Sequence, residues 1–175
     1  ALVSLWPTNT WNSLAERALF QASKALEMAS EFPQQVSLIT SKSNLSQFIL
    51  QRQANPQLLG MLLGTEGSHA LDGDLKNIQR LFDSGFRMMS LQHFFDNKLG
   101  GSLHGESGEG LTAFGREALQ RMQSLGIMLD VSHSSEQVVQ DVLAISRQPL
   151  LVSHTGFHGH CPSPRNISDD LMQQI

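Results

Sequence analysis

Short hydrophobic runs alternate with longer segments of helical periodicity along almost the whole chain, and this alternation constrains the fold more than any other feature. Each run has the length of a buried strand, and each intervening segment is long enough for a helix. Such an alternation is typical of a parallel sheet whose strands are joined by crossover helices. We therefore predict an α/β fold with about six strands. The expected strands are residues 1–7, 36–40, 58–66, 86–92, 127–132 and 150–153.

The expected helices carry recognisable start and stop signals. Ser13 and Glu16 have the spacing of a capping box, which predicts a helix over 14–32. Thr112 is the expected cap of a later helix, and Gly126 is expected to end it. These signals separate the helices from the hydrophobic runs and support the alternating pattern.

Four polar side chains stand where successive hydrophobic runs stop: Glu66, His93, His133 and His154. Because the carboxyl ends of parallel strands lie at the same edge of a sheet, we expect these four side chains to meet at that edge. The active sites of α/β enzymes lie there. An open nucleotide-binding sheet is disfavoured, since no G-x-G-x-x-G motif joins a strand to a helix. Four contributing strands favour a TIM barrel, which needs eight strands. About six strands therefore predict an incomplete (β/α)8 barrel.

Composition narrows the classes of protein and of partner. The chain has 175 residues, 40% of them hydrophobic, and no linker-like stretch, so we expect one domain over residues 1–175. The formal charge is −4 without a basic cluster, which argues against nucleic acid as a partner. The apolar runs fall short of the roughly 20 residues of a transmembrane helix. Cys161 is the single cysteine, so an internal disulfide is excluded.

A polar, glycine-rich stretch over residues 96–110 follows the fourth expected strand. It is too irregular for a helix or a strand, and loops of this length are uncommon in compact domains unless they are functional. We expect it to be an active-site loop or lid.

Imidazole nitrogens and carboxylate oxygens are ligands that suit zinc, and a catalytic zinc keeps three protein ligands. His133, His154 and Glu66 are therefore candidate metal ligands. His93 is either an additional ligand or a hydrogen-bond donor to the substrate carbonyl or the tetrahedral intermediate. Arg165 lies in the loop after His154. Its guanidinium either binds a substrate carboxylate or pairs with an acidic neighbour on the surface.

Four segments of the chain strongly resemble the membrane dipeptidase (renal dipeptidase) family of zinc peptidases, particularly its bacterial members. The resemblance implies an amidohydrolase-type barrel that hydrolyses the peptide bond of dipeptides through a metal-bound hydroxide between two zinc ions. The segments are EGSHAL (66–71), QHFFDNKLGGSLHG (92–105), GLTAFGREALQRMQSLGIMLDVSHSS (110–135), and VSHTGF (152–157) with CPSPRNISDD (161–170).

The resemblance also implies a role for each matched residue. Glu66 resembles the carboxylate that bridges both metals, and His133 and His154 resemble the remaining ligands of one of them. His93 resembles the catalytic histidine that binds the substrate and the intermediate, and Arg165 resembles the residue that contacts the substrate carboxylate.

Two features of the family are missing from this sequence. The His-x-Asp pair of the first barrel strand and the late aspartate of the last strand have no counterpart. We therefore expect an internal fragment that lacks the first and last barrel strands, holds one zinc ion and is inactive alone. Unpaired strand edges favour homo-oligomers or complementation by the missing segments. Two alternatives remain open: another metal-dependent barrel hydrolase of the deaminase or lactonase type, and a non-catalytic binding module.

Overall fold

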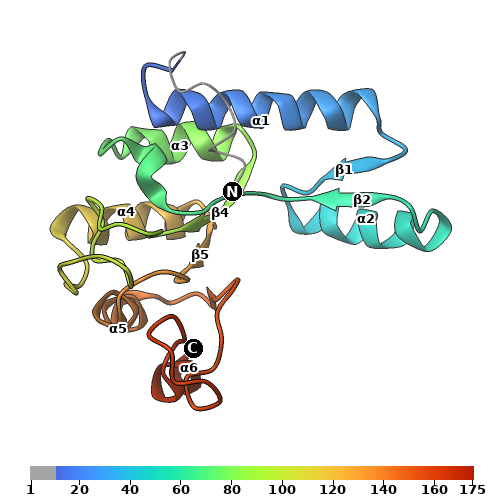
Figure 1. Cartoon of the computed structure of the whole chain (residues 1–175). Helices are drawn as coiled ribbons and strands as arrows, with labels where there is room; N and C mark the ends of the chain where they lie inside the picture. The colour runs from blue at the N-terminus through green and yellow to red at the C-terminus, as the bar shows by residue number, and fades with distance from the viewer. Residues whose placement is uncertain (1–10) are drawn as a thin grey trace.

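The computed structural model describes residues 11–175, so the strand expected over 1–7 lies outside the described residues. Strands and helices alternate along the chain, as predicted (Figure 1). The helices are α1 (Leu14–Glu31), α2 (Lys42–Ala54), the 3-10 helix η3 (Ser68–Leu71), α3 (Lys76–Asp83), α4 (Ala113–Ser124), α5 (Glu136–Ile145) and α6 (Asp169–Gln174). The strands are β1 (Val36–Leu38), β2 (Leu59–Met61), β3 (Leu63–Thr65), β4 (Phe86–Ser90), β5 (Met128–Asp130) and β6 (Leu150–Leu151).

All pairings between the named strands are parallel, which confirms the expected sheet type. One sheet has four strands in the order β3-β4-β5-β6, and a second sheet pairs β1 with β2. The single strand expected over 58–66 is instead divided at Leu62 between the two sheets. The register of β3 on β4 also shifts between Leu63 and Gly64. The backbone therefore changes direction where the sequence shows one continuous apolar run.

Side-chain caps begin the helices at the predicted places. The hydroxyl of Ser13 accepts the N–H of Glu16, and the hydroxyl of Thr112 accepts the N–H of Gly115. Gly126 follows helix α4 with φ +72°, a conformation that glycine adopts without strain. These contacts confirm the helix starts at 14 and 113 and the stop at 126.

The main core lies between the four-stranded sheet and helices α3, α4 and α5. It is built from side chains that are almost completely shielded from solvent, and burial of such apolar surface is the dominant stabilising term in folding. They include Ile78, Met89, Leu119, Leu129 and Val138. This packing holds the ends of β4 and β5 in fixed positions.

The second sheet and helix α2 project to one side of the rest of the chain, and we call residues 36–61 the arm (Figure 1). All 13 residues of α2 remain at least partly exposed. Large apolar side chains on the arm face solvent, including Ile49, Leu50 and Leu59. The arm is tied to the main sheet by Arg87 of β4, whose Nε donates to the Thr40 carbonyl at 2.7 Å.

None of the helices within residues 11–175 combines the length and the apolar character that a bilayer-crossing helix needs.

Candidate metal centre

The four polar residues singled out in the sequence meet at the C-terminal edge of the main sheet. Glu66 follows β3, His93 follows β4, His133 follows β5, and His154 follows β6. Glu66 lies at the centre of the group, because its Oε1 is 3.4 Å from His93 Nε2, 3.5 Å from His133 Nε2 and 3.2 Å from His154 Nε2. The expectation that parallel strands bring these side chains together is confirmed.

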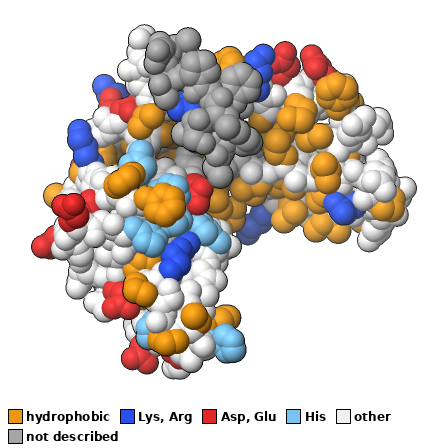
Figure 2. All heavy atoms as spheres, in the orientation of Figure 1, with side chains coloured by type: hydrophobic (Ala, Val, Ile, Leu, Met, Phe, Trp, Pro, Cys, Tyr) orange, Lys and Arg blue, Asp and Glu red, His pale blue; other side chains and the backbone are white. Residues whose placement is uncertain are grey.

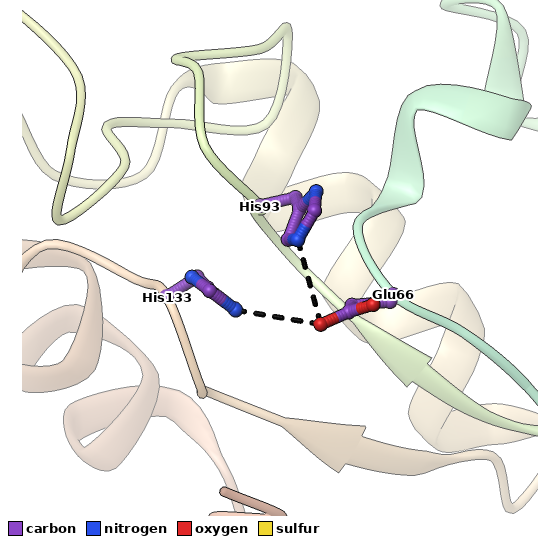
Figure 3. Close-up of side chains that lie close together, drawn as sticks. All are labelled: Glu66, His93 and His133. Atoms are coloured by element: carbon purple, nitrogen blue, oxygen red, sulfur yellow. Dashed lines mark ion pairs between the residues drawn. The ribbon is translucent and has the colours of Figure 1, made fainter. Parts of the chain in front are cut away.

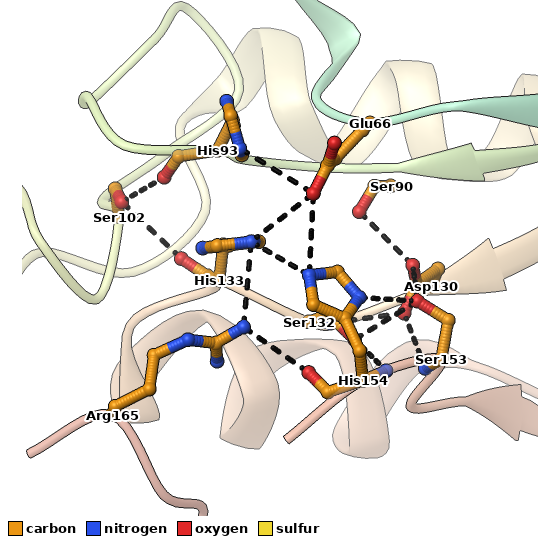
Figure 4. Close-up of polar contacts among 10 residues, drawn as sticks. All are labelled: Glu66, Ser90, His93, Ser102, Asp130, Ser132, His133, Ser153, His154 and Arg165. Atoms are coloured by element: carbon orange, nitrogen blue, oxygen red, sulfur yellow. Dashed lines mark hydrogen bonds and ion pairs between the residues drawn. The ribbon is translucent and has the colours of Figure 1, made fainter. Parts of the chain in front are cut away.

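Two overlapping sets of three side chains have metal-ligand spacing within this cluster. One ligand atom from each of Glu66, His93 and His133 lies within 4.8 Å of the others (Figure 3). His154 is equally near, since its Nε2 is 2.8 Å from His133 Nε2 (Figure 4). The geometry therefore brings four candidate ligands together.

Two of the three distances among Glu66, His133 and His154 fit a small divalent ion. Ligand atoms about 2.0–2.1 Å from a tetrahedral zinc are about 3.3 Å apart. The two distances from Glu66 Oε1, 3.5 and 3.2 Å, bracket this value. The third distance, 2.8 Å between the two Nε2 atoms, is that of a hydrogen bond. Two imidazoles and a carboxylate are also the donor types that zinc prefers.

His133 is the most constrained of the four side chains. It is 4% exposed, and its backbone has φ +66°, in the left-handed region that few non-glycine residues occupy. Its Nδ1 is buried and has no hydrogen-bond partner among the described residues. Burial first, and then the nearby positive charge of Arg165, lower the pKa of His133 to about 4. The ring is thus neutral at physiological pH, as a metal ligand must be.

The expected functional loop over 96–110 packs against the cluster. The hydroxyl of Ser102 donates to the His93 carbonyl, and the N–H of Leu103 donates to the His133 carbonyl at 2.7 Å. Asp96 organises the loop, because its carboxylate accepts backbone N–H groups of Ser102, Glu106 and Ser107. Hydrogen bonding, from Ser102 first, lowers the pKa of Asp96 despite some desolvation. The loop therefore links the backbones that carry His93 and His133.

Arg165 lies beside the cluster. Its Nη2 is 3.2 Å from the His154 carbonyl oxygen and 3.4 Å from His133 Nε2. Arg165 and His133 line one cavity of about 230 Å³, whose apolar wall includes Val131, Val139 and Leu171. This volume is below the roughly 300–1,000 Å³ of pockets for drug-sized ligands. The cavity is suited to a small molecule.

The sequence reasoning missed two rings that border the cluster. Phe94 is 51% exposed, and its ring centroid lies 4.3 Å from that of His93. His104, in the loop over 96–110, is exposed, and its ring centroid lies 5.6 Å from that of His133. Figure 2 shows the histidines gathered on one face with apolar, acidic and basic side chains among them. The adjacency of Phe94 to His93 in the sequence was the one available signal.

The sequence reasoning also assigned no role to Asp130, which ends β5 beside the cluster, next to Ser153 and His154 (Figure 4). The carboxylate is 1% exposed. Its burial alone would raise the pKa of Asp130, but hydrogen bonds from Ser153 and Ser132 outweigh that effect and lower it. Asp130 is therefore a buried anion beside the candidate ligands.

A parallel sheet with a carboxylate and three histidines at the C-terminal ends of its strands is the arrangement typical of metal-dependent barrel enzymes. Comparison with known proteins then specifies the family. The model of the membrane dipeptidase family (peptidase family M19) matches residues 3–175, and the chain belongs to this family. The resemblance stated from the motifs is confirmed, and membership of a metallopeptidase family implies metal ions.

Relatives and solved structures agree with this assignment. Dipeptidase 3 of Mus musculus is 30% identical over 174 residues, covering 90% of this chain and 31% of its own. The probable dipeptidase PvdM from Pseudomonas aeruginosa has a similar fold, with a TM-score of 0.81 at 23% identity over 98% of this chain and 44% of its own. A metallo peptidase from Rhodobacter sphaeroides, liganded with a phosphinate mimic of the dipeptide L-Ala-D-Ala, has a TM-score of 0.71 at 25% identity over 90% of this chain and 45% of its own.

The chain spans about a third of the curated mouse relative and under half of these solved structures. Together with the parallel α/β arrangement, this confirms the predicted fold class, a TIM-barrel type of which the chain covers only part.

Proposed function

We propose that this chain carries the metal-binding and carboxylate-binding groups of a zinc-dependent dipeptidase that hydrolyses the peptide bond of dipeptides. The observation that carries the proposal is the convergence of Glu66, His133 and His154 at adjacent strand ends, with ligand atoms 2.8–3.5 Å apart, in a chain of the membrane dipeptidase family. Dipeptidase 3 and the Rhodobacter structure with its dipeptide mimic support the same substrate class.

Zinc is the metal that the donor set favours, because it combines two imidazole nitrogens with a carboxylate oxygen. A bound ion would supply Lewis-acid chemistry, polarising the scissile carbonyl and lowering the pKa of a water molecule so that hydroxide is available as the nucleophile. Glu66, whose Oε1 faces the histidines, would be the carboxylate shared by two metals, as the resemblance to the family implies.

We assign His93 to the substrate instead of the metal. Its side chain is 30% exposed, between the 4% of His133 and the 44% of His154, so exposure does not set it apart, and the assignment follows the resemblance of residues 92–105 to the family. Its imidazole can donate a hydrogen bond to the scissile carbonyl and to the oxyanion that forms from it. Such a bond strengthens as negative charge develops on that oxygen, which makes His93 a candidate catalytic residue.

Arg165 is the proposed contact for the terminal carboxylate of the dipeptide. A guanidinium forms paired hydrogen bonds with a carboxylate, and Arg165 lines the 230 Å³ cavity beside His133. Because this cavity is small, a fixed carboxylate contact next to the metal centre would limit cleavage to short peptides.

The test substitutes Glu66→Gln, which retains the shape of the side chain and removes its charge. Zinc binding is measured on this chain by competition with a chromophoric chelator, and hydrolysis of a dipeptide panel is measured on the natural protein that contains this sequence. We expect zinc affinity and kcat/KM each to fall by more than about 100-fold, beyond the 10–100-fold losses typical of residues that only support a ligand. Chelation should abolish hydrolysis, and zinc should restore it.

The matched control is Glu117→Gln, because Glu117 is exposed on helix α4. It should leave zinc affinity and turnover unchanged. Full activity of the Glu66→Gln variant, or turnover of nucleobases or lactones in preference to dipeptides, would contradict the proposal.

A further inference from the structure

The buried carboxylate of Asp130 joins the ends of three strands beside the metal centre. Its Oδ1 accepts the backbone N–H groups of Ser132 at 3.0 Å and Ser153 at 3.1 Å. Its Oδ2 accepts the hydroxyls of Ser90 at 3.1 Å and Ser153 at 2.6 Å (Figure 4). All four donors are neutral, so the carboxylate keeps a full negative charge inside the sheet edge without a cationic partner among them.

This arrangement determines which atom accepts the hydrogen of the Ser153 hydroxyl. A hydroxyl carries one hydrogen, and an ionised carboxylate can only accept. Because Asp130 Oδ2 lies 2.6 Å from Ser153 Oγ, the hydroxyl donates its hydrogen there. The same Oγ is 2.8 Å from Nδ1 of His154 and has only lone pairs left to offer it. His154 Nδ1 must therefore carry a hydrogen and donate it to Ser153.

A neutral imidazole has one N–H, so a hydrogen on Nδ1 leaves Nε2 of His154 as a bare lone pair. That Nε2 is the atom 3.2 Å from Glu66 Oε1 and 2.8 Å from His133 Nε2. We propose that Asp130, acting through Ser153, fixes the Nδ1–H tautomer of His154 and so presents its Nε2 as a ready metal ligand. This inference rests on the proposed metal centre, and Asp130 is a positioning residue within it.

His133 provides an internal contrast. Its Nδ1 is buried without a hydrogen-bond partner among the described residues, so no neighbouring acceptor holds a hydrogen there. The tautomer of His133 is then set by its Nε2 contacts with Glu66 and His154. Of the two proposed histidine ligands, only His154 has its Nδ1 linked to a carboxylate, and this link runs through Ser153. A carboxylate partner on the nitrogen that does not bind the metal commonly fixes the orientation of metal-binding histidines.

The decisive variant is Asp130→Asn. Two backbone N–H groups face the Oδ1 position, so the amide oxygen stays there and the NH₂ group takes the place of Oδ2. The amide then donates to the Ser153 hydroxyl, which becomes free to donate to His154 Nδ1. The expected result is a reversal of His154 to the Nε2–H tautomer, whose hydrogen must move to Nδ1 before Nε2 can bind a metal.

The tautomer is read from the ¹⁵N shifts of the His154 ring in the metal-free chain, in alkaline solution well above the ordinary histidine pKa of about 6.5. Wild type should show the Nδ1–H form, and Asp130→Asn should show the Nε2–H form. Ser153→Ala should give the mixture of Nδ1–H and Nε2–H tautomers that a free imidazole shows. If Asp130→Asn does not fold, Ser153→Ala replaces it as the test variant. Ser90→Ala is the matched control, since it removes the other hydroxyl from the same Oδ2 without touching His154.

Zinc affinity of the same chain is the second readout. Asp130→Asn and Ser153→Ala should each weaken it by about 10–100-fold, the usual effect of losing the partner of a ligand, and Ser90→Ala should not. An unchanged His154 tautomer in Asp130→Asn, an equal effect of Ser90→Ala, or a reversed tautomer with unchanged zinc affinity would each overturn the inference. Absence of zinc binding by wild type would refute the proposed metal centre, whereas the ring shifts would still decide the link from Asp130 to His154.

Discussion

The main sheet and the arm are built from the same kinds of element, yet they bury their apolar residues very differently. Helix α4, which packs against β5, buries Leu119 and Met122 to 0% exposure, whereas helix α2 leaves Leu50 65% exposed. Both helices start with a Ser or Thr cap whose hydroxyl accepts the N–H three residues on. The caps therefore do not distinguish the two regions, and tertiary burial does.

The difference matters for the site, because all four candidate metal-centre residues follow strands of the main sheet. Their positions depend on β3 to β6 and on the helices packed against them. The arm contributes strands β1 and β2 and an exposed apolar surface but no residue of the cluster. Stability of the site and stability of the arm should accordingly be separable by experiment.

The largest difference between the two regions is expected in the free energy of unfolding, when the same substitution is made in each. Leu119→Ala should lower the free energy of unfolding by about 2–5 kcal/mol, since it leaves a cavity in the closed core. Leu50→Ala should change it by less than about 0.5 kcal/mol, because the side chain already faces solvent. Urea denaturation monitored by circular dichroism measures both values. Equal losses would show that α2 is covered in solution and would break the contrast.

Zinc should slow the hydrogen exchange of amides in the main sheet more than in the arm. A ligand that binds only the folded site at 100 times its Kd stabilises it by about 2.7 kcal/mol. Amides of β4 and β5 should therefore exchange more slowly with zinc, while amides of α2, which open locally, should exchange at the same rate. Hydrogen exchange with and without the metal measures this. Similar protection of α2 would mean that the arm and the sheet open together.

Acid should loosen the loop over the site without affecting the arm. The pKa of Asp96 is lowered in the folded chain, mainly by the N–H of Ser102. The stabilisation of the loop by the Asp96 carboxylate is therefore complete above the ordinary Asp pKa of about 3.9. It is lost as the pH falls through the lower pKa that Asp96 has in the folded chain. The amide shifts of Ser102, Glu106 and Ser107 should follow that transition. In Asp96→Asn the transition should be missing. An identical acid transition in that variant would assign it to another carboxylate.

Much of the fold followed from the sequence because it rests on local signals. The hydrophobic runs and the caps at Ser13 and Thr112 predicted where strands and helices begin, and parallel topology then required Glu66 and the three histidines to meet. The division of residues 58–66 at Leu62 was not predictable from the run itself, because both halves are equally apolar and only pairing with different partners separates them.

The inner arrangement of the site was beyond the sequence for a different reason. The link from Asp130 through Ser153 to His154 depends on hydroxyl orientations across two strands, and the hold of Asp96 on residues 102–107 depends on the path of an irregular loop. Neither has a periodicity or a fixed spacing. The division of roles between His93 and His154 stays a prediction, because both rings lie within 3.4 Å of the same Glu66 oxygen.

The left-handed backbone of His133, with φ +66°, sets stability against function at a single position. A residue with a side chain pays about 1–2 kcal/mol for this conformation, and glycine adopts it at little cost. Selection of variants of this chain for thermal stability alone would therefore favour glycine at position 133. The resulting protein would have a less strained turn and would lack a proposed zinc ligand.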